Sequence, residues 1–292
     1  MSSPTKQPTL KNRKERLLFI AFGTSHPHQM DSYKQMEKDM LVHYPSENVA
    51  WSYTSDTIRE KLAGQGTIIP TIEENLHRLS ELSLKNKSIH SLRVQSLHIT
   101  AGEEFSQMER ILVRYIDKHP QRFSHLFLGR PLLESERDRN ETITAILEDF
   151  PKERKPDEAI LLMGHGQKQG RGDLILADFA HTLAQHDPFA FFATLEGSKK
   201  IDNILTQLKE NQIKTVWLAP FLFMIGNHVA KDLLGDALHP DSWFNRLKDE
   251  GFIVKFHLKG LGDNATIRSI FIRHALESTD DLVPLSTKTL NL

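Results

Sequence analysis

The sequence predicts an α/β protein built from two similar halves, each a mainly parallel sheet flanked by helices. Three observations support this prediction. Short runs rich in apolar residues alternate with amphipathic helical patterns, as in sheets covered on both faces. The order of these features in residues 16–150 recurs in residues 151–278. The chain of 292 residues is also about twice the length of a typical domain.

Apolar runs bounded by turn residues predict the strands. Each run has the length of an ordinary strand, and each is followed by a glycine, a proline or a polar cluster. The predicted strands are residues 17–22, 49–53, 92–97 and 125–128 in the first half, and residues 159–163, 189–195, 215–221 and 253–258 in the second.

Apolar residues at helical spacing predict helices between these strands. Pro70 opens a stretch in which Ile72, Leu76 and Leu79 share one face, and proline suits the first turn of a helix. A second helix is expected over residues 104–119.

Serine residues before two later apolar patterns predict helix N-caps. Ser198 precedes a stretch that carries Ile201, Leu205 and Leu208 on one face. Ser242 precedes a further amphipathic helix that begins near Trp243.

Three features of the first half return in the second half in the same order. Each match alone is weak, but the shared order favours a duplication with a cleft between the two units. The matching pairs are residues 17–24 with 160–167, 92–104 with 216–228, and 125–133 with 253–262.

The domain boundary is expected in the proline-rich and charged stretch near residues 151–157. This gives a first half over residues 16–150 and a second half over residues 151–278, which carries the candidate metal ligands. Residues 1–15 and 279–292 are polar, without helical period, and are expected to be flexible tails.

Composition excludes several classes of protein. Lys and Arg number 37 against 38 Asp and Glu, so no basic field indicates a nucleic-acid partner. The absence of cysteine excludes disulfides, thiolate-bound zinc and iron–sulfur clusters. The longest apolar runs, such as residues 17–22 and 216–225, are too short to cross a membrane, so a cytoplasmic protein is expected.

Candidate metal ligands follow three strands of the second half. His165 lies after residues 159–163, Glu196 ends the next strand, and His228 follows residues 215–221. Ligands of open parallel sheets bind beyond the carboxyl ends of the strands. Two imidazoles and a carboxylate suit a borderline divalent ion, and three ligands leave a coordination position vacant. The alternative is that each histidine is an ordinary hydrogen-bonded loop residue.

The matching places in the first half hold Phe22 and Glu104. Glu104 is expected to face the same cleft as an additional carboxylate near the metal. The alternative is an acid that interacts with a helix N-terminus. His98 is read as structural or as a substrate contact, and His26 as a residue of the cleft mouth or a solvated one.

These same residues carry a family resemblance that spans residues 17–277. The sequence resembles the anaerobic-pathway sirohydrochlorin cobalt chelatases, a group of class II tetrapyrrole chelatases related to ferrochelatase. The matching stretches are residues 21–25, 94–99, 102–104, 128–133, 163–166, 196, 226–228, 241–243, 260–264 and 267–268.

The resemblance implies two Rossmann-like domains with the active site between them, and a cobaltochelatase that inserts Co²⁺ into sirohydrochlorin with release of two protons. It implies that His165, Glu196 and His228 bind the metal and that Glu104 is the opposing acid. His165 is further expected to assist proton removal.

Substrate binding is expected from residues that could meet the carboxylates of the tetrapyrrole. Arg130, just beyond the strand at residues 125–128, is the first cationic candidate, followed by Arg59 and Lys199. Ser25 and His98 are further candidate substrate contacts. Arg130 and Asn227 depart from the family pattern, which leaves the preferred metal open.

Cobalt(II) is therefore expected as a substrate metal, with iron or nickel as alternatives, and no organic cofactor is expected. The expected partners are a tetrapyrrole and a divalent metal, with no nucleic acid and no membrane; a homo-oligomer is left open. A non-catalytic carrier of metal or tetrapyrrole and a metal-free α/β protein are the competing hypotheses.

Overall fold

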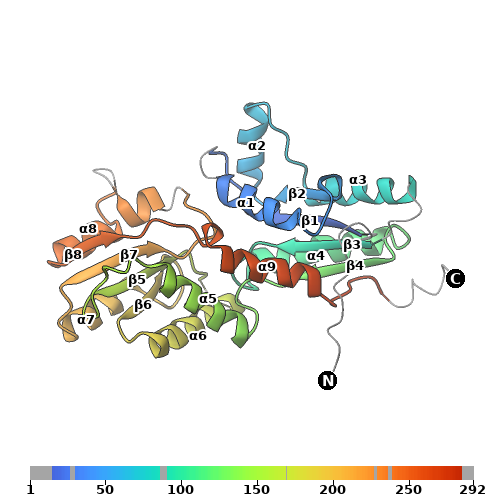
Figure 1. The fold of residues 1–292 in the computed structure, drawn as a ribbon. Coiled ribbons are helices and arrows are strands. Elements are labelled where there is room, and N and C mark those ends of the chain that lie inside the picture. The colour runs from blue at the N-terminus through green and yellow to red at the C-terminus, as the bar shows by residue number, and fades with distance from the viewer. Residues whose placement is uncertain are drawn as a thin grey trace, which may run out of the picture.

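The computed structural model describes residues 15–26, 30–85, 91–168, 170–226, 229–235 and 239–284, with residues 83–85 described by their backbone alone. It contains two four-stranded parallel sheets, ordered β2-β1-β3-β4 and β6-β5-β7-β8 (Figure 1). The predicted α/β class with two similar halves is confirmed. The strands are β1 (Glu15–Ala21), β2 (Val49–Tyr53), β3 (Ser91–Ser96), β4 (His125–Gly129), β5 (Ala159–Gly164), β6 (Ala190–Thr194), β7 (Thr215–Pro220) and β8 (Ile253–Phe256).

Helices cover both sheets. Those that follow strands of the first sheet are α1 (Asp31–Met40), α2 (Asp56–Gly64), α3 (Ile72–Lys85), α4 (Glu103–Lys118) and α5 (Glu136–Asp149). Those that follow strands of the second sheet are α6 (Arg171–His186), α7 (Ile201–Glu210), α8 (Trp243–Asp249) and α9 (Ala265–Glu277). Short helical turns are η3 (Ser46–Asn48), the π-helix η4 (Val229–Leu234) and η5 (Leu261–Asp263).

The two predicted serine caps have different outcomes. The side chain of Ser242 accepts a hydrogen bond from the backbone N–H of Asn245 and caps α8, as predicted. Ser198 does not cap α7, because that helix begins at Ile201 after Lys200. The backbone N–H of Ser198 instead donates to the carboxylate of Asp173 on α6.

Alternate residues of the central strands enter different cores because both faces of each sheet are covered. On β1, Leu18 and Ile20 belong to a core that α3 and α4 complete. Leu17 and Phe19 face the other way, into a core that also contains Phe179 and other residues of the second half. The two halves therefore share one continuous hydrophobic core.

The last helix of each half covers the sheet of the other half (Figure 1). Helix α9, drawn in red, contacts β3 and β4 of the first sheet. Helix α5, drawn in green, ends beneath the second sheet, where Phe150 packs against Trp217 at 6.4 Å between ring centroids. The structure thus differs from the predicted boundaries, which assigned α5 to the first unit and α9 to the second.

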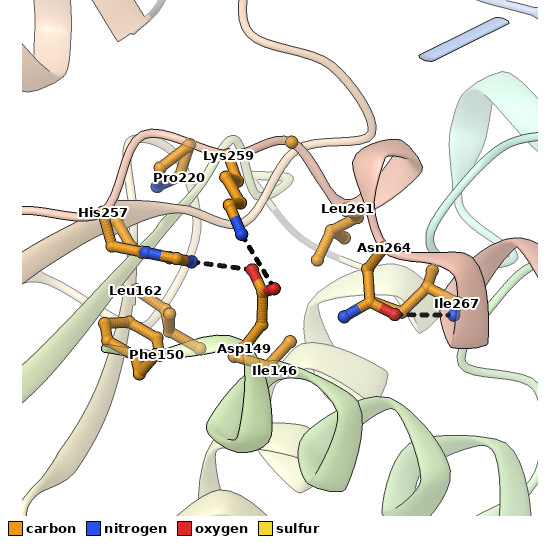
Figure 2. Close-up of a pocket in the computed structure, with 12 residues that line it drawn as sticks. Ile146, Asp149, Phe150, Leu162, Pro220, His257, Lys259, Leu261, Asn264 and Ile267 are labelled. Carbon is orange, nitrogen blue, oxygen red and sulfur yellow. Dashed lines mark hydrogen bonds and ion pairs between the residues drawn. The ribbon is translucent and has the colours of Figure 1, made fainter. Parts of the chain in front are cut away.

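The end of α5 is held in place by charge as well as by packing (Figure 2). Asp149 accepts a hydrogen bond from the Nε2 atom of His257 at 2.9 Å and pairs with the Nζ atom of Lys259 at 3.0 Å. These side chains line a small cavity of about 30 Å³, which has room for a single water molecule.

Residues after α9 also bind the first sheet. The backbone N–H of Leu128 donates to the carbonyl of Asp280, and that of Leu282 donates to the carbonyl of Leu126, both at 2.9 Å. Residues 280–282 therefore pair with the outer edge of β4. Part of the predicted tail at residues 279–292 is consequently an ordered element of the first half. Within the described ranges, no helix has the length and apolar character that crossing a bilayer requires.

Candidate metal and macrocycle site

A cavity of about 840 Å³ opens between the two halves, beyond the carboxyl ends of the strands. Its lining comes from the loops that follow β1, β3, β5, β6 and β7, together with part of α2. The titratable residues of the lining are His26, Lys61, His98, Glu103, Glu104, His165, Lys168 and Glu196, with the phenol of Tyr33.

His165 and Glu196 stand next to each other in this cavity. The backbone N–H of Glu196 donates to the carbonyl of His165 at 2.8 Å. Gly166 makes the approach possible: its φ is +79°, and a Cβ there would lie 2.0 Å from the carbonyl oxygen of Glu196. Both predicted ligands therefore lie at the same edge of the second sheet, with the imidazole of His165 exposed.

The third predicted ligand, His228, lies outside the described residues, as does Asn227. The chain is described up to Gly226, which lines the cavity, and resumes at Val229 in the π-helix η4. Among the residues that are described, no group of three His, Asp or Glu side chains is close enough to hold a metal. The predicted metal-binding set consists of His165, Glu196 and His228, so one of its three members lies outside the described residues.

Glu104 reaches the cavity from the first half, where it is the second residue of α4. Its Oε2 atom lies 3.4 Å from the Nε2 atom of His98, a buried side chain with only 10% of its surface exposed. The contact with His98 holds the pKa of the Glu104 carboxyl below its ordinary value, against burial, and His165 reinforces this effect. The structure therefore brings the acid of one half within electrostatic reach of the imidazole of the other.

His98 is itself held by Ser96. The Oγ atom of Ser96 accepts a hydrogen bond from the backbone N–H of His98 at 3.1 Å, which leaves its hydroxyl proton for the Nδ1 atom of His98, 2.6 Å away. In that arrangement the ring proton is on Nε2, which lies near the Glu104 carboxylate without a hydrogen bond to it. Ser96, His98 and Glu104 form a chain from the sheet to the cavity.

Tyr33, Phe223 and Phe22 line the cavity and together form its aromatic wall. Tyr33 of the first half stacks on Phe223 of the second half, with ring centroids 5.4 Å apart and planes at 19°. Its hydroxyl accepts a hydrogen bond from the backbone N–H of Gly23, and burial raises its pKa well above the ordinary value. Phe22 also lines the cavity with 51% of its surface exposed. Apolar faces of this kind suit a flat, largely apolar ligand.

The cationic residues of the cavity differ from the predicted one. Among the described residues of the lining, Lys61 on α2 and Lys168 after β5 are the cations. Arg130 is absent from the lining, and its guanidinium pairs with Asp280 instead. Ser25 does line the cavity and is buried. Nothing in the pattern around Lys61 indicated its position, because α2 contacts the sheet through β2 at the far edge.

Comparison with known proteins adds a family to this geometry. Residues 15–280 match the family model described as cobalt chelatase (CbiK). The chain is 29% identical over 286 residues to the sirohydrochlorin cobaltochelatase CbiKC of Nitratidesulfovibrio vulgaris, covering 96% of this chain and 97% of that protein. It is also 29% identical over 263 residues to the sirohydrochlorin cobaltochelatase of Salmonella typhimurium, covering 89% of this chain and 95% of that one.

Solved structures share the fold. SirB from Bacillus subtilis with Fe³⁺ matches with a TM-score of 0.62 at 15% identity, covering 92% of this chain and 99% of that one. The sirohydrochlorin chelatase SirB from Bacillus subtilis subspecies spizizenii in complex with cobalt matches with a TM-score of 0.58 at 12% identity, with the same coverage. At this level of identity the likeness concerns the fold.

Proposed function

The chain belongs to the cobalt chelatase (CbiK) family, and from that premise we propose that it inserts Co²⁺ into sirohydrochlorin and releases two protons. The observation that carries the proposal is the cavity between the halves, in which Glu104 of one half faces His165 and Glu196 of the other. Both substrates need access to one space, because the ion has to pass from protein ligands to the ring.

His165, Glu196 and His228 are proposed to hold the metal. Imidazole and carboxylate ligands bind borderline divalent ions without the stronger grip of thiolates. A loose grip is required because the four ring nitrogens must win the ion from the protein. The exposed imidazole of His165 and the adjoining Glu196 support this role, since both can meet an ion that enters from solvent.

Glu104 is proposed to accept a pyrrole proton while the metal enters from the opposite wall. The Glu104 carboxyl is ionised at neutral pH and can therefore accept a proton, while the lowered pKa makes it a weaker base than an ordinary glutamate. Ser96 and His98 support this role, because Ser96 holds the imidazole of His98 beside the carboxylate. His165 is the proposed route for the second proton, once its ring is released from the metal.

The macrocycle is proposed to lie against the aromatic wall, with its carboxylates toward Lys61, Lys168 and Ser25. Two lysines at the cavity offer charge-assisted hydrogen bonds to carboxylates, and the Ser25 hydroxyl offers a further donor. Arg130 is left out of the proposed site because Asp280 already satisfies its guanidinium.

An anaerobic assay tests the function. Purified protein is mixed with sirohydrochlorin and with Co²⁺, Fe²⁺ or Ni²⁺ in separate reactions, and the absorption spectrum is followed. Cobalt insertion well above the spontaneous rate, over many turnovers, is expected. One equivalent of bound metal or tetrapyrrole without turnover would instead indicate a carrier. Faster insertion of iron or nickel would assign the alternative metal.

A further inference from the structure

The side chain of Gln167 fills a narrow space between two glycines that belong to different halves. A Cβ atom built on Gly102, at the start of α4, would lie 1.6 Å from the Nε2 atom of Gln167. A Cβ atom on Gly172, in the first turn of α6, would lie 2.2 Å from its Oε1 atom. For both glycines the three nearest atoms all belong to Gln167. The carboxamide therefore touches the backbone of both helices.

The backbone at these two glycines does not itself require glycine. Gly102 has φ −94° and ψ −159°, which any residue adopts, and Gly172 is not among the residues with positive φ. Gly166, in contrast, has a positive φ and closely approaches backbone as well. Space for Gln167 is thus the reason for glycine at 102 and 172, whereas the turn itself is the reason at 166.

Gln167 connects the parts of the site that come from opposite walls. It lies two residues after His165, and its carbonyl oxygen would be 2.5 Å from a Cβ on Gly197, just after Glu196. Gly102 lies two residues before Glu104 in the turn that starts α4. The side chain therefore spans from the loop with the metal-binding residues to the helix that carries the acid.

We propose that Gln167 is a positioning residue: its side chain sets the separation between His165 and Glu104 across the cleft. This inference rests on the proposed function, because it assigns the spacing a role in metal insertion. Proton acceptance and metal delivery must reach the same ring nitrogens from two sides. An error of about 1 Å in such an arrangement can lower a rate as much as 100-fold.

The spacer can be removed by three independent substitutions. Gln167→Ala deletes the carboxamide, while Gly102→Ala and Gly172→Ala each displace it with a methyl group. Because the displaced atoms are the far end of a flexible side chain, both glycine variants are expected to fold. Each single variant should lower kcat roughly tenfold and leave the KM for Co²⁺ and for sirohydrochlorin within about twofold.

The double variant Q167A/G102A gives the decisive measurement. Since both substitutions remove the same contact, its kcat should equal that of Q167A alone rather than fall a further tenfold. Gln167→Met, which keeps the length of the side chain, should retain most of the activity. Gly64→Ala is the matched control, because its methyl group would meet nothing within 4 Å.

The outcomes separate this inference from the proposed function. An inactive wild-type protein would overturn the proposed function. The free energies of unfolding of Q167A, G102A and the double variant would then still test the contact, which predicts that the effects of the two substitutions are not additive. An active wild type with a Q167A variant of equal kcat would overturn the inference alone. A Q167A variant that changes KM instead of kcat, or a Met variant as slow as the Ala variant, would also overturn it.

Discussion

The two halves have the same strand order but contribute different chemistry. In both sheets the first strand is central, pairs in parallel with the second and third, and ends in the cleft. After β1 the chain places the apolar Phe22 there, and after β5 it places His165. The first turn of α4, after β3, supplies Glu104, whereas the described loop after β7 supplies aromatic side chains such as Phe223. The same strand order thus presents an acid on one side of the cleft and the proposed metal ligands on the other.

The comparison also explains why the two walls can act on one ring. Helix α5 covers the second sheet and helix α9 covers the first, so neither half is complete without a helix from the other. The walls are held by shared core packing, with the stacked rings of Tyr33 and Phe223 at the floor. The loops of the two halves can therefore differ in sequence while the two sides of the cleft keep their relative placement.

Removing the imidazole of His165, on the side of the cleft that the second half forms, should lower the rate of cobalt insertion more than any other substitution. His165→Ala is expected to lower kcat by about 100-fold or more, because it removes the side chain proposed to act both as a metal ligand and as a proton acceptor. The spectroscopic cobalt-insertion assay measures this, and His181→Ala, on the exposed face of α6, is the control. Activity near that of the wild type would break the proposed division between the halves.

Breaking the charge network between α5 and α9 should lower the free energy of unfolding more than any of the other substitutions. Asp138 is buried and meets Ser135, Arg273 and the Nε2 atom of His274 at 3.1 Å. Burial alone would raise its pKa, but these partners together hold it well below the ordinary value. Asp138→Asn should cost about 2 kcal/mol in the free energy of unfolding, because it removes the charged acceptor of the hydrogen bonds that Arg273 and Ser135 make to Asp138, while Arg273 keeps its pair with Glu141.

The sign of the pH dependence follows from that lowered pKa. The stabilisation from Asp138 is fully present above the ordinary carboxyl pKa of 3.8 and is lost as the pH falls toward the lower value of the folded state. Urea unfolding between pH 7 and pH 3 should therefore bring the wild type and D138N closer together. Asp178→Asn, at a half-exposed pair with Arg139, is the control. A gap that widens on acidification would contradict the assignment.

Neutralising the acid of the first wall should affect turnover rather than binding. Glu104→Gln is expected to lower kcat roughly 10- to 100-fold, because the amide cannot accept a pyrrole proton. Glu109→Gln on the same helix is the matched control outside the cavity. If E104Q changed KM and left kcat intact, Glu104 would be a substrate contact and not a proton acceptor.

The cations around the cavity should have a smaller effect, and one confined to KM. Lys61→Ala and Lys168→Ala are each expected to raise the KM for sirohydrochlorin several-fold, about 3- to 10-fold at low salt, and less at high salt. Arg130→Ala should leave that KM unchanged because Arg130 does not line the cavity. A raised KM in R130A would restore the prediction made from its position after β4.

The smallest expected effect concerns the residues behind Glu104. Without the His98 contact the pKa of Glu104 should rise toward its ordinary value of 4.5. His98→Ala should therefore move the acid limb of the pH profile of kcat/KM to higher pH, with a loss of about twofold to fivefold in kcat near neutrality. Ser96→Ala should move it in the same direction by less. An unmoved limb would make His98 a packing residue.

Local patterns were sufficient to predict the strands and the edge at which the site lies. Each strand followed from an apolar run that ends in a turn, and parallel strands bring their carboxyl ends to one edge. Ile72, Leu76 and Leu79, predicted to share one face of a helix, are buried in α3. The proximity of His165 and Glu196 required only that their strands be neighbours, which the strand order provides.

Features that depend on contacts between distant residues were not predictable from those patterns. The exchange of α5 and α9 leaves no trace in their periodicity, since an amphipathic face fits either sheet. Arg130 was expected in the cleft because of its place after a strand, but its partner Asp280 is 150 residues away. Gly102 belongs to a recognisable motif, yet the reason for glycine there became visible only with Gln167 packed upon it.

The placement of α9 has a consequence for how the chain acquires its structure during synthesis. The sheet that the ribosome produces first receives part of its cover and a partner for its edge from residues 265–282, which follow every strand of the second sheet in the chain. Until then α1 covers that face at β1, but the part over β3 and β4 that α9 contacts lacks its cover, so a nascent chain halted before α9 should associate with chaperones. The first half is therefore expected to complete its packing only after the residues of α9 have been made.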